Sequence, residues 1–392
     1  MPASTAPSCL RPARPMADGL PLDTGSRDGQ AGQTTPGTQG GAQVGARAGA
    51  GRAQRSGPAL TILWVLLGRE DKASSRVRGY WIAEALRARG HRVRIRHAQN
   101  RWQYLSLLAA ARGADAVIFQ KKYGRYDLLT SRVLQRLGRR VYFDIDDAPS
   151  RTRATATQQR ANRMMALSDG VLAGSQALAR LARQQQATVH LLPSGVQLAN
   201  YQVKRHIPKD SLCLGWIGNG AHYADDLIRI LRAPLQQIGA RRPVTFRIVG
   251  ACGVQKLHEA FADLQGVTPD FIDQIPWSDP AAVAAAIAPF DIGLYPLSQH
   301  PFNAYKCAFK ALEYMASGLP VVASAVGANA ETVLEGQTGF LCHSTQDWVQ
   351  AIDSLGADAD LRSRFGANGR RRAEEQYDVA RLAARLETIL QR

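Results

Sequence analysis

Short apolar runs and helical stretches alternate along this chain from residue 61 to its end. The apolar runs have the length of buried strands, and the stretches between them repeat apolar residues at a spacing of three and four. Such alternation predicts βα units around a parallel sheet. The strands expected in the first half are 61–68, 92–96, 116–120, 140–145, 170–173 and 189–192. The helices expected between them are 78–89, 128–137, 157–168 and 176–186.

The same alternation starts again after a turn at 193–196 and a polar linker that ends at about residue 208. The second set of expected strands is 212–217, 244–249, 270–275, 291–297, 321–324 and 339–342. Its helices are 222–238, 279–288, two more up to about residue 376, and an amphipathic last helix at 378–390. We therefore expect an α/β protein with two doubly wound Rossmann-like domains, 59–200 and 201–392. A ligand cleft is expected where the carboxyl ends of their strands face each other.

Residues 1–58 differ from the rest, because they are rich in Gly, Ala, Pro, Gln, Ser and Thr and have almost no large apolar residues. We expect a disordered low-complexity tail there. Met16 offers a second start, so whether the tail is expressed stays open. No stretch has the roughly 20 apolar residues that cross a bilayer. The five cysteines are scattered without a C-x-x-C pair, which indicates a reducing compartment and a cytoplasmic location.

The net charge of +17 lies almost wholly in the first predicted domain. Residues 59–200 have 24 basic and 9 acidic residues, a net charge of +15, whereas 201–392 have 19 and 20, a net charge of −1. One interpretation is a solvated arginine-rich surface. Another is peripheral contact with the inner face of an anionic membrane. Nucleic acid is not expected as a partner, since no helix-turn-helix, zinc finger or RNA-binding aromatic signature is present.

The stretch 303–331 carries the candidate chemistry. Lys306, Lys310 and Glu313 are four and three residues apart, which predicts that they share one face of a helix. Free N–H groups at a helix start, together with the helix dipole, favour a phosphate beside the two lysines. The alternative is an ordinary amphipathic helix whose lysines are solvated.

The residues that follow resemble the C-terminal signature of glycosyltransferase family 4, the retaining nucleotide-sugar transferases of the GT-B fold. That signature is a Glu, seven residues, a second Glu, then Met-Ala-x-Gly-x-Pro-Val-Val-Ala-Ser and Gly-Gly-x-x-Glu. Glu313 stands at the second Glu, and 315–324 reads MASGLPVVAS. Gly327 and Ala328 stand at the Gly-Gly pair. The chain departs from the family at the first Glu, where it has Tyr305.

The resemblance implies the GT-B fold, with two Rossmann-like domains facing across a cleft, and sugar transfer with retention from a nucleotide-diphosphate sugar without metal or other cofactor. It places Lys306 and Lys310 on the diphosphate, with the N–H groups of Gly327 and Ala328 assisting, and Glu313 on the ribose. Tyr305 would lie beside the donor sugar. The acceptor is unknown, but a basic acceptor domain suggests an anionic or lipid-linked one.

Two turns could add contacts to the donor. Gly218 and Asn219 follow the first strand of the second domain, where a glycine turn lets the backbone approach a phosphate. Family members have Arg and Lys in this region, and this chain has Asn219 and His222 instead. In the first domain, Ser75 and Arg76 could reach the cleft from the loop after the first strand. The alternatives are an ordinary strand-to-helix turn at Gly218, and Ser75 as a helix cap.

Asp146 stands where relatives have a His that approaches the donor sugar, and it could orient a sugar hydroxyl or take the acceptor proton. Asp144 and Asp146 alternate on one strand, so a Mg²⁺ or Mn²⁺ site is a less favoured alternative. Two other functions also stay open, and Tyr305 supports the first of them. One is an inactive protein that binds a nucleotide sugar or glycan, and the other is a sugar-nucleotide epimerase of the GT-B fold. The retained charges of Lys306, Lys310 and Asp146 favour an active transferase.

Overall fold

The structure is a computed structural model that describes residues 57–149, 155–186 and 188–392. The predicted tail therefore lies outside the described residues, except for its last two positions.

The first half folds around a six-stranded parallel sheet with the strand order β2-β1-β3-β4-β5-β6. The apolar runs form strands because both faces of the sheet are covered, and every residue of β3 is buried. The strands are β1 (Thr61–Val65), β2 (Arg92–Arg96), β3 (Ala116–Gln120), β4 (Arg140–Ile145), β5 (Gly170–Ala173) and β6 (Val189–Leu191).

Helices cover both faces of this sheet. Side chains alternate along β1, so that Ile62 and Trp64 pack on one side and Leu63 and Val65 on the other. The first side is covered by α2 (Trp81–Ala88) and the C-terminal α14 (Val379–Gln391). The second side is covered by α3 (Arg101–Ala110), α4 (Arg125–Arg136), α5 (Thr155–Leu167) and α6 (Gln176–Arg183). A short helix, α1 (Ala73–Ser75), and a π-helical turn, η1 (Arg76–Tyr80), lead directly into α2.

The second half is a second six-stranded parallel sheet with the order β12-β11-β10-β7-β8-β9. Its strands are β7 (Leu212–Ile217), β8 (Val244–Val249), β9 (Val267–Ile272), β10 (Ile292–Tyr295), β11 (Val321–Ser324) and β12 (Gly339–Cys342). One face is covered by α7 (Gly220–Gly239), α8 (Gln255–Ala262) and α12 (Thr345–Ala357), and the other by α9 (Pro280–Ile287) and α10 (Phe309–Ala316). The remaining elements are η2 (Leu198–Asn200), η3 (Asn303–Tyr305), α11 (Asn329–Thr332), α13 (Ala359–Arg372) and η4 (Ala373–Tyr377).

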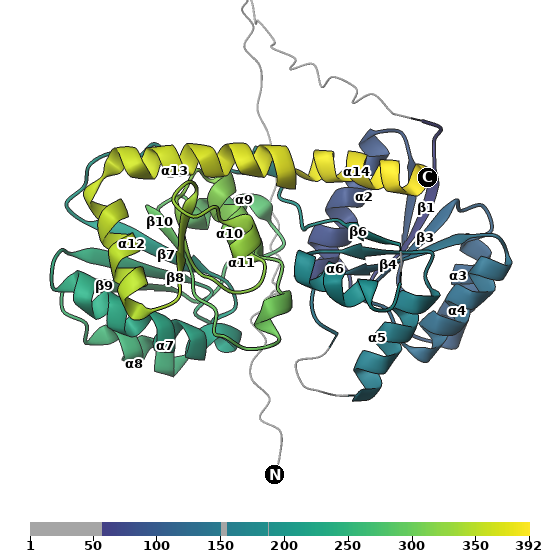
Figure 1. Cartoon of the computed structure of the whole chain (residues 1–392), viewed down its shortest axis with the longest axis horizontal. Coiled ribbons are helices and arrows are strands. Elements are labelled where there is room, and N and C mark those ends of the chain that lie inside the picture. The colour runs from purple at the N-terminus through teal and green to yellow at the C-terminus, as the bar shows by residue number, and fades with distance from the viewer. Residues whose placement is uncertain (1–56, 150–154, 187) are drawn as a thin grey trace, which may run out of the picture.

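The chain returns to the first sheet at its C-terminus, and Figure 1 shows α13 and α14 running along one side of both sheets. Leu382, Leu386 and Leu390 of α14 are buried in the cluster that also contains β1 and α2. The buried carboxylate of Glu387 accepts a hydrogen bond from Arg89 at 2.6 Å, which ties α14 to the end of α2. The hydrophobic core of the first half is therefore completed by the last residues of the second.

The observed architecture confirms the predicted α/β class with two Rossmann-like sheets. Two helices, α3 and α8, were not predicted. The exposed face of α3 carries Trp102 and Leu105, which hides its amphipathic pattern, although Asn100 and Gln103 form a capping box that marks its start. The first helical segment starts at Ala73, earlier than expected.

We expect Leu386→Ala in α14 to lower the free energy of unfolding by about 2–5 kcal/mol, because it removes a fully buried side chain from the first core. Chemical denaturation followed by tryptophan fluorescence measures the change. The control is Thr388→Ala on the exposed side of the same helix, for which we expect a change below about 0.5 kcal/mol. Equal effects of the two substitutions would contradict the packing of α14 on the first sheet.

Candidate active site

A cavity of about 720 Å³ lies between the two sheets, at the carboxyl ends of strands from both halves. Its first-half wall follows β1, β3 and β4, and its second-half wall follows β7 and β10. The lining residues are Lys72, Ala73, Ser74, Val77, Lys121, Asp146, Asp147, Ser194, His222, Tyr223, Tyr295, Phe302, Lys306, Cys307, Ala308, Phe309 and Lys310. Asp146, Lys306 and Lys310, the three residues to which the sequence assigned catalysis, therefore share one cavity.

The start of α10 forms the wall that carries the lysines. The predicted single helix through Lys306 and Lys310 is wrong, because Lys306 has extended backbone and Ala308 has a left-handed one with φ +51°. The helix begins only at Phe309, so Lys306 reaches the cavity from the preceding loop. Among the described residues, the N–H groups of Ala308, Phe309 and Lys310 find no acceptor. This helix start has free donors and the positive end of the helix dipole, a combination that favours an anion.

Aromatic rings surround the two ammonium groups. The Lys310 Nζ lies 4.1 Å from the ring centre of Tyr223, 4.9 Å from that of Tyr295 and 5.5 Å from that of Trp216. The Lys306 Nζ lies 4.1 Å from the same Tyr223 ring and donates a hydrogen bond to its hydroxyl group. Ring faces attract a cation without neutralising it. The wall therefore keeps its positive charge available for a ligand.

Burial lowers the pKa of Lys310 to about 7, and the nearby charge of Lys306 contributes to the lowering. Burial likewise raises the pKa of Glu313 to about 7. In the described structure, Lys310 forms no ion pair. Near neutral pH, Lys310 is therefore only partly protonated, and an anion in the cavity would favour its charged form.

Glu313 lies behind the lysines and does not line the cavity. Its carboxylate accepts a hydrogen bond from the Tyr201 hydroxyl group at 3.3 Å. Arg76 is buried and donates to the carbonyl groups of Glu70 at 3.0 Å and Asp71 at 3.4 Å. The charge of Glu313 acts against the lowering of the Arg76 pKa by burial, so these two groups face each other between the two halves.

Asp146 stands on the opposite wall with a lysine beside it. The Lys121 Nζ lies 3.2 Å from Asp146 and 3.0 Å from Asp147. Lys121 has a left-handed backbone with φ +52°, which a non-glycine residue rarely adopts and which often marks a functional site. The two walls meet where the Cys307 Sγ lies 2.7 Å from the Asp146 carbonyl oxygen. A carboxylate and a lysine from the first half thus face two lysines from the second.

Asp144 does not take part in the cavity. It is fully buried, and both of its oxygens accept hydrogen bonds from Arg78, one of them at 3.2 Å. Arg78 also donates to the Leu192 carbonyl group at 2.5 Å and so joins η1, β4 and the end of β6. The alternative of a metal held by Asp144 and Asp146 does not fit this pairing. In the described part of the chain, no group of three His, Cys, Asp or Glu residues is arranged to hold a metal ion.

The glycine turn after β7 packs behind the lysine wall, by which we mean the cavity wall that carries Lys306 and Lys310. The N–H groups of Gly218 and Gly220 donate to the carbonyl groups of Val249 and Gly250 at 2.9 and 2.7 Å. They are therefore directed into the sheet, and Gly218 and Asn219 do not line the cavity. A Cβ atom at Gly218 would lie 2.6 Å from the Lys310 Cε, so this glycine leaves space for the lysine side chain.

The other predicted ligand residues also lie outside the cavity lining. Ser75 lies inside the first helical segment, so its predicted role as helix cap is wrong, and its Oγ accepts from the Gly68 N–H at 3.0 Å. Tyr305 packs against the core of the first half. In the described chain, the N–H groups of Gly327 and Ala328 have no acceptor. The donor contacts predicted for Ser75, Gly327 and Ala328 therefore stay predictions.

Sequence reasoning assigned no role to the aromatic residues that line the cavity, which are Tyr223, Tyr295, Phe302 and Phe309. Tyr223 lies in the first turn of the helix that follows the glycine turn, which was a usable signal. Tyr295 ends a buried strand and could not be told from a core residue.

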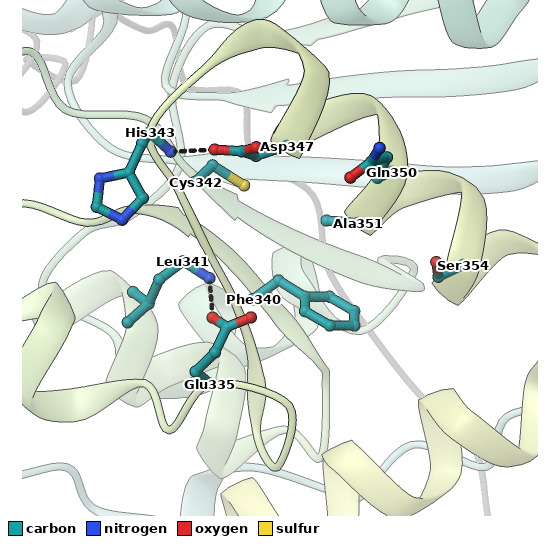
Figure 2. A pocket seen from close by; sticks show the side chains of 9 residues that line it. All are labelled: Glu335, Phe340, Leu341, Cys342, His343, Asp347, Gln350, Ala351 and Ser354. Carbon is teal, nitrogen blue, oxygen red and sulfur yellow. Dashed lines mark hydrogen bonds between the residues drawn. The ribbon is translucent and has the colours of Figure 1, made fainter.

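A second pocket, shown in Figure 2, lies beside β12 and α12. Both of its carboxylates accept hydrogen bonds from nearby backbone groups. Glu335 accepts from the Leu341 N–H at 2.6 Å, and Asp347 accepts from the His343 N–H at 2.8 Å. These contacts stabilise a strand and a helix start, so the two carboxylates of this pocket have partners within the protein. The described helices include none that is long and apolar enough to cross a membrane.

Residues 211–358 match the model of the family described as "Glycosyl transferases group 1". The match covers β7 to α12 and includes both lysines of the cavity wall.

Curated relatives match over limited segments. A D-inositol 3-phosphate glycosyltransferase of Stackebrandtia nassauensis is 31% identical over 176 residues, which are 41% of this chain and 37% of that protein. An alpha-1,3/1,6-mannosyltransferase of Dictyostelium discoideum is 34% identical over 82 residues, 21% of this chain and 20% of that protein. This chain therefore spans well under half of the length of either relative.

Solved structures resemble the whole two-sheet architecture. Anabaena HepE in complex with UDP is 16% identical, with a TM-score of 0.65, over 85% of this chain and 100% of that one. Sucrose-phosphate synthase from Thermosynechococcus elongatus is 17% identical, with a TM-score of 0.63, over 84% and 98% of the two chains. At this level of identity the similarity concerns the fold, and the fold is GT-B as predicted.

We expect Lys310 to titrate near pH 7, well below the ordinary lysine value of about 10.4. Competitive labelling of the full chain with a small amine reagent, read out by mass spectrometry over a pH series, measures the half-point of its reactivity. In Lys306→Met the half-point should move to higher pH, because the neighbouring positive charge is removed. A half-point above pH 9 in the unaltered protein would contradict the burial of this ammonium group among aromatic rings.

Proposed function

We propose that this protein transfers a glycosyl group from a nucleotide-diphosphate sugar to a hydroxyl group of an acceptor, with retention of the anomeric configuration. The observation that carries the proposal is the uncapped start of α10 beside Lys306 and Lys310, on the wall of a cavity between two Rossmann-like sheets. Two independent likenesses support it. The family match includes this wall, and one structure of similar fold holds UDP.

The lysine wall is suited to a leaving diphosphate. In the transfer, the bond between the anomeric carbon and the phosphate oxygen breaks, and the diphosphate leaves with the electron pair and an added negative charge. Lys306, Lys310 and the free N–H groups of Ala308 and Phe309 stabilise that charge where it develops. These groups are fixed before the reaction, so this stabilisation requires no metal ion.

The opposite wall is suited to the acceptor. The acceptor oxygen forms its new bond to the anomeric carbon on the face that the diphosphate leaves, and its proton must pass to a base. Asp146 lies on this wall, and Lys121 beside it keeps the carboxylate in place. We assign Asp146 to orienting the acceptor hydroxyl group or to receiving its proton. The proton would reach Asp146 either directly or by way of the departing phosphate.

The ribose is assigned to Glu313, whose two oxygens match two neighbouring hydroxyl groups. In the structure the Tyr201 hydroxyl group donates a hydrogen bond to one oxygen of this carboxylate. This hydrogen bond holds the Glu313 carboxylate in position and uses only one of its two oxygens.

A second candidate function is binding of a nucleotide sugar without transfer. The favouring observation is Tyr305, which replaces the Glu expected at the donor sugar and packs against the first core outside the cavity lining. Binding without turnover would indicate this function, and conversion of the nucleotide sugar without an acceptor would indicate an epimerase.

We expect Lys310→Met to weaken the binding of UDP or GDP, whichever the protein prefers, by roughly 10- to 100-fold, because a charged hydrogen bond contributes about 1.5–3 kcal/mol. Calorimetric titration of the full chain, with and without Mg²⁺, measures the affinity. The matched control is Lys256→Met, which removes an exposed lysine on α8 and should leave the affinity unchanged. Binding should also weaken as the pH rises from 7 to 8, by up to about fivefold, because Lys310 loses its proton. Binding that requires Mg²⁺ would count against the lysine assignment.

We expect Asp146→Asn to lower the rate of transfer by about 10²–10⁴-fold while leaving nucleotide affinity within a few fold, because the amide cannot accept a proton. Turnover is followed by release of the nucleoside diphosphate, and NMR of the product gives its anomeric configuration. Asp147→Asn is the neighbouring control, since Asp147 also pairs with Lys121. An inverted product would overturn retention, and equal losses in both variants would reduce Asp146 to a charge partner of Lys121.

A further inference from the structure

The outer surface of α3 and α4 carries large apolar side chains that the fold does not cover. Trp102 and Leu105 on α3 are 64% and 55% exposed, and Leu129 on α4 is 59% exposed. The two helices are neighbours, because the rings of Tyr104 and Tyr126 lie 5.5 Å apart and the Tyr104 hydroxyl group donates to Asp127. Half of the large exposed hydrophobic side chains in the described structure thus lie on one helix pair.

Exposed arginines lie on the same two helices and on the turns after them. The exposed arginines of the helix pair and the turns that follow it are Arg101, Arg112, Arg125, Arg132 and Arg136. Within the described residues, none of the five forms an ion pair with a carboxylate. Their charge is therefore not neutralised by the protein itself. The Arg101 guanidinium lies over the Trp102 ring at 4.8 Å, so one cation and one apolar group are presented together.

The helix pair is also placed with respect to the cavity. α3 starts after the carboxyl end of β2, and α4 starts after the carboxyl end of β3, where Lys121 lines the cavity. The Lys122 Nζ donates to the Ala98 carbonyl group at 2.7 Å and joins the two connections. The first turns of both helices, with Arg101, Trp102 and Arg125, therefore lie on the edge of the sheet at which the cavity opens. Figure 1 shows the pair at the end of the first sheet farthest from the second.

We propose that this surface docks the protein on an anionic lipid bilayer. A tryptophan and leucines that project between unpaired arginines match the boundary between lipid phosphates and acyl chains, where apolar burial and attraction to anionic lipid act together. Charge complementarity selects the anionic bilayer over a neutral one, since the first half has a net charge of +15 from 24 basic and 9 acidic residues. Docking is independent of the transferase proposal.

The test is sedimentation of the full chain with vesicles of phosphatidylcholine alone and of phosphatidylcholine with phosphatidylglycerol. We expect binding to the anionic vesicles only. Arg101→Gln/Arg125→Gln should weaken it by about 25-fold, at roughly fivefold for each arginine near the surface. Trp102→Ser/Leu105→Ser should weaken it without changing its salt dependence. All four side chains are exposed, so folding is not expected to change.

The matched control is Arg180→Gln/Arg183→Gln, which removes two exposed arginines from α6 in the same half of the molecule. It should retain most of the binding. Failure to bind anionic vesicles, equal binding to neutral ones, or equal losses in the α6 control would each overturn the proposal. Binding to an acidic protein or to RNA without binding to vesicles would also overturn the proposal, because it would indicate another partner for the same surface.

Discussion

The candidate site depends on holding two lysine ammonium groups of like charge in one cavity wall. Burial, and to a smaller extent the repulsion by Lys306, lower the pKa of Lys310 to about 7, and aromatic ring faces offset part of the cost without cancelling the charge. The surrounding backbone is arranged for this purpose. Gly218 leaves room for one lysine, and the left-handed Ala308 delays the helix so that its free N–H groups face the same cavity as Lys306. A bound anion would offset the repulsion between the two ammonium groups.

The strands were predictable because a fully buried apolar run has few alternatives, and β8 has the predicted bounds without change. The lysine wall was predicted for a partly wrong reason. A spacing of four residues does place Lys306 and Lys310 together, but through a loop and a helix start, since no sequence signal shows that Ala308 adopts a positive φ. The Tyr201 contact to Glu313 joins residues 112 positions apart, a distance at which a single sequence gives no pairing information.

Two aspartates, Asp144 in β4 and Asp146 just after it, show how much of a motif is decided by tertiary partners. Asp144 and Asp146 alternate as expected, yet one is paired with Arg78 in the core and the other faces the cavity. Arg76 and Arg78 come from the same π-helical turn, which directs one arginine toward the second half and the other into the first. The pattern Asp-x-Asp therefore led to one residue that lines the cavity, but which of the two carboxylates does so depends on an arginine 66 residues away from Asp144.

The return of α14 to the first sheet also sets an order of events during synthesis. The first sheet starts at Thr61, but its covering helix does not begin until Val379, so the nascent first half must remain on the ribosome with Trp81 and Leu86 uncovered. At roughly 5–20 residues per second, this interval is on the order of 15–60 s. In a chain that terminates before α14, this side of the first sheet would stay uncovered.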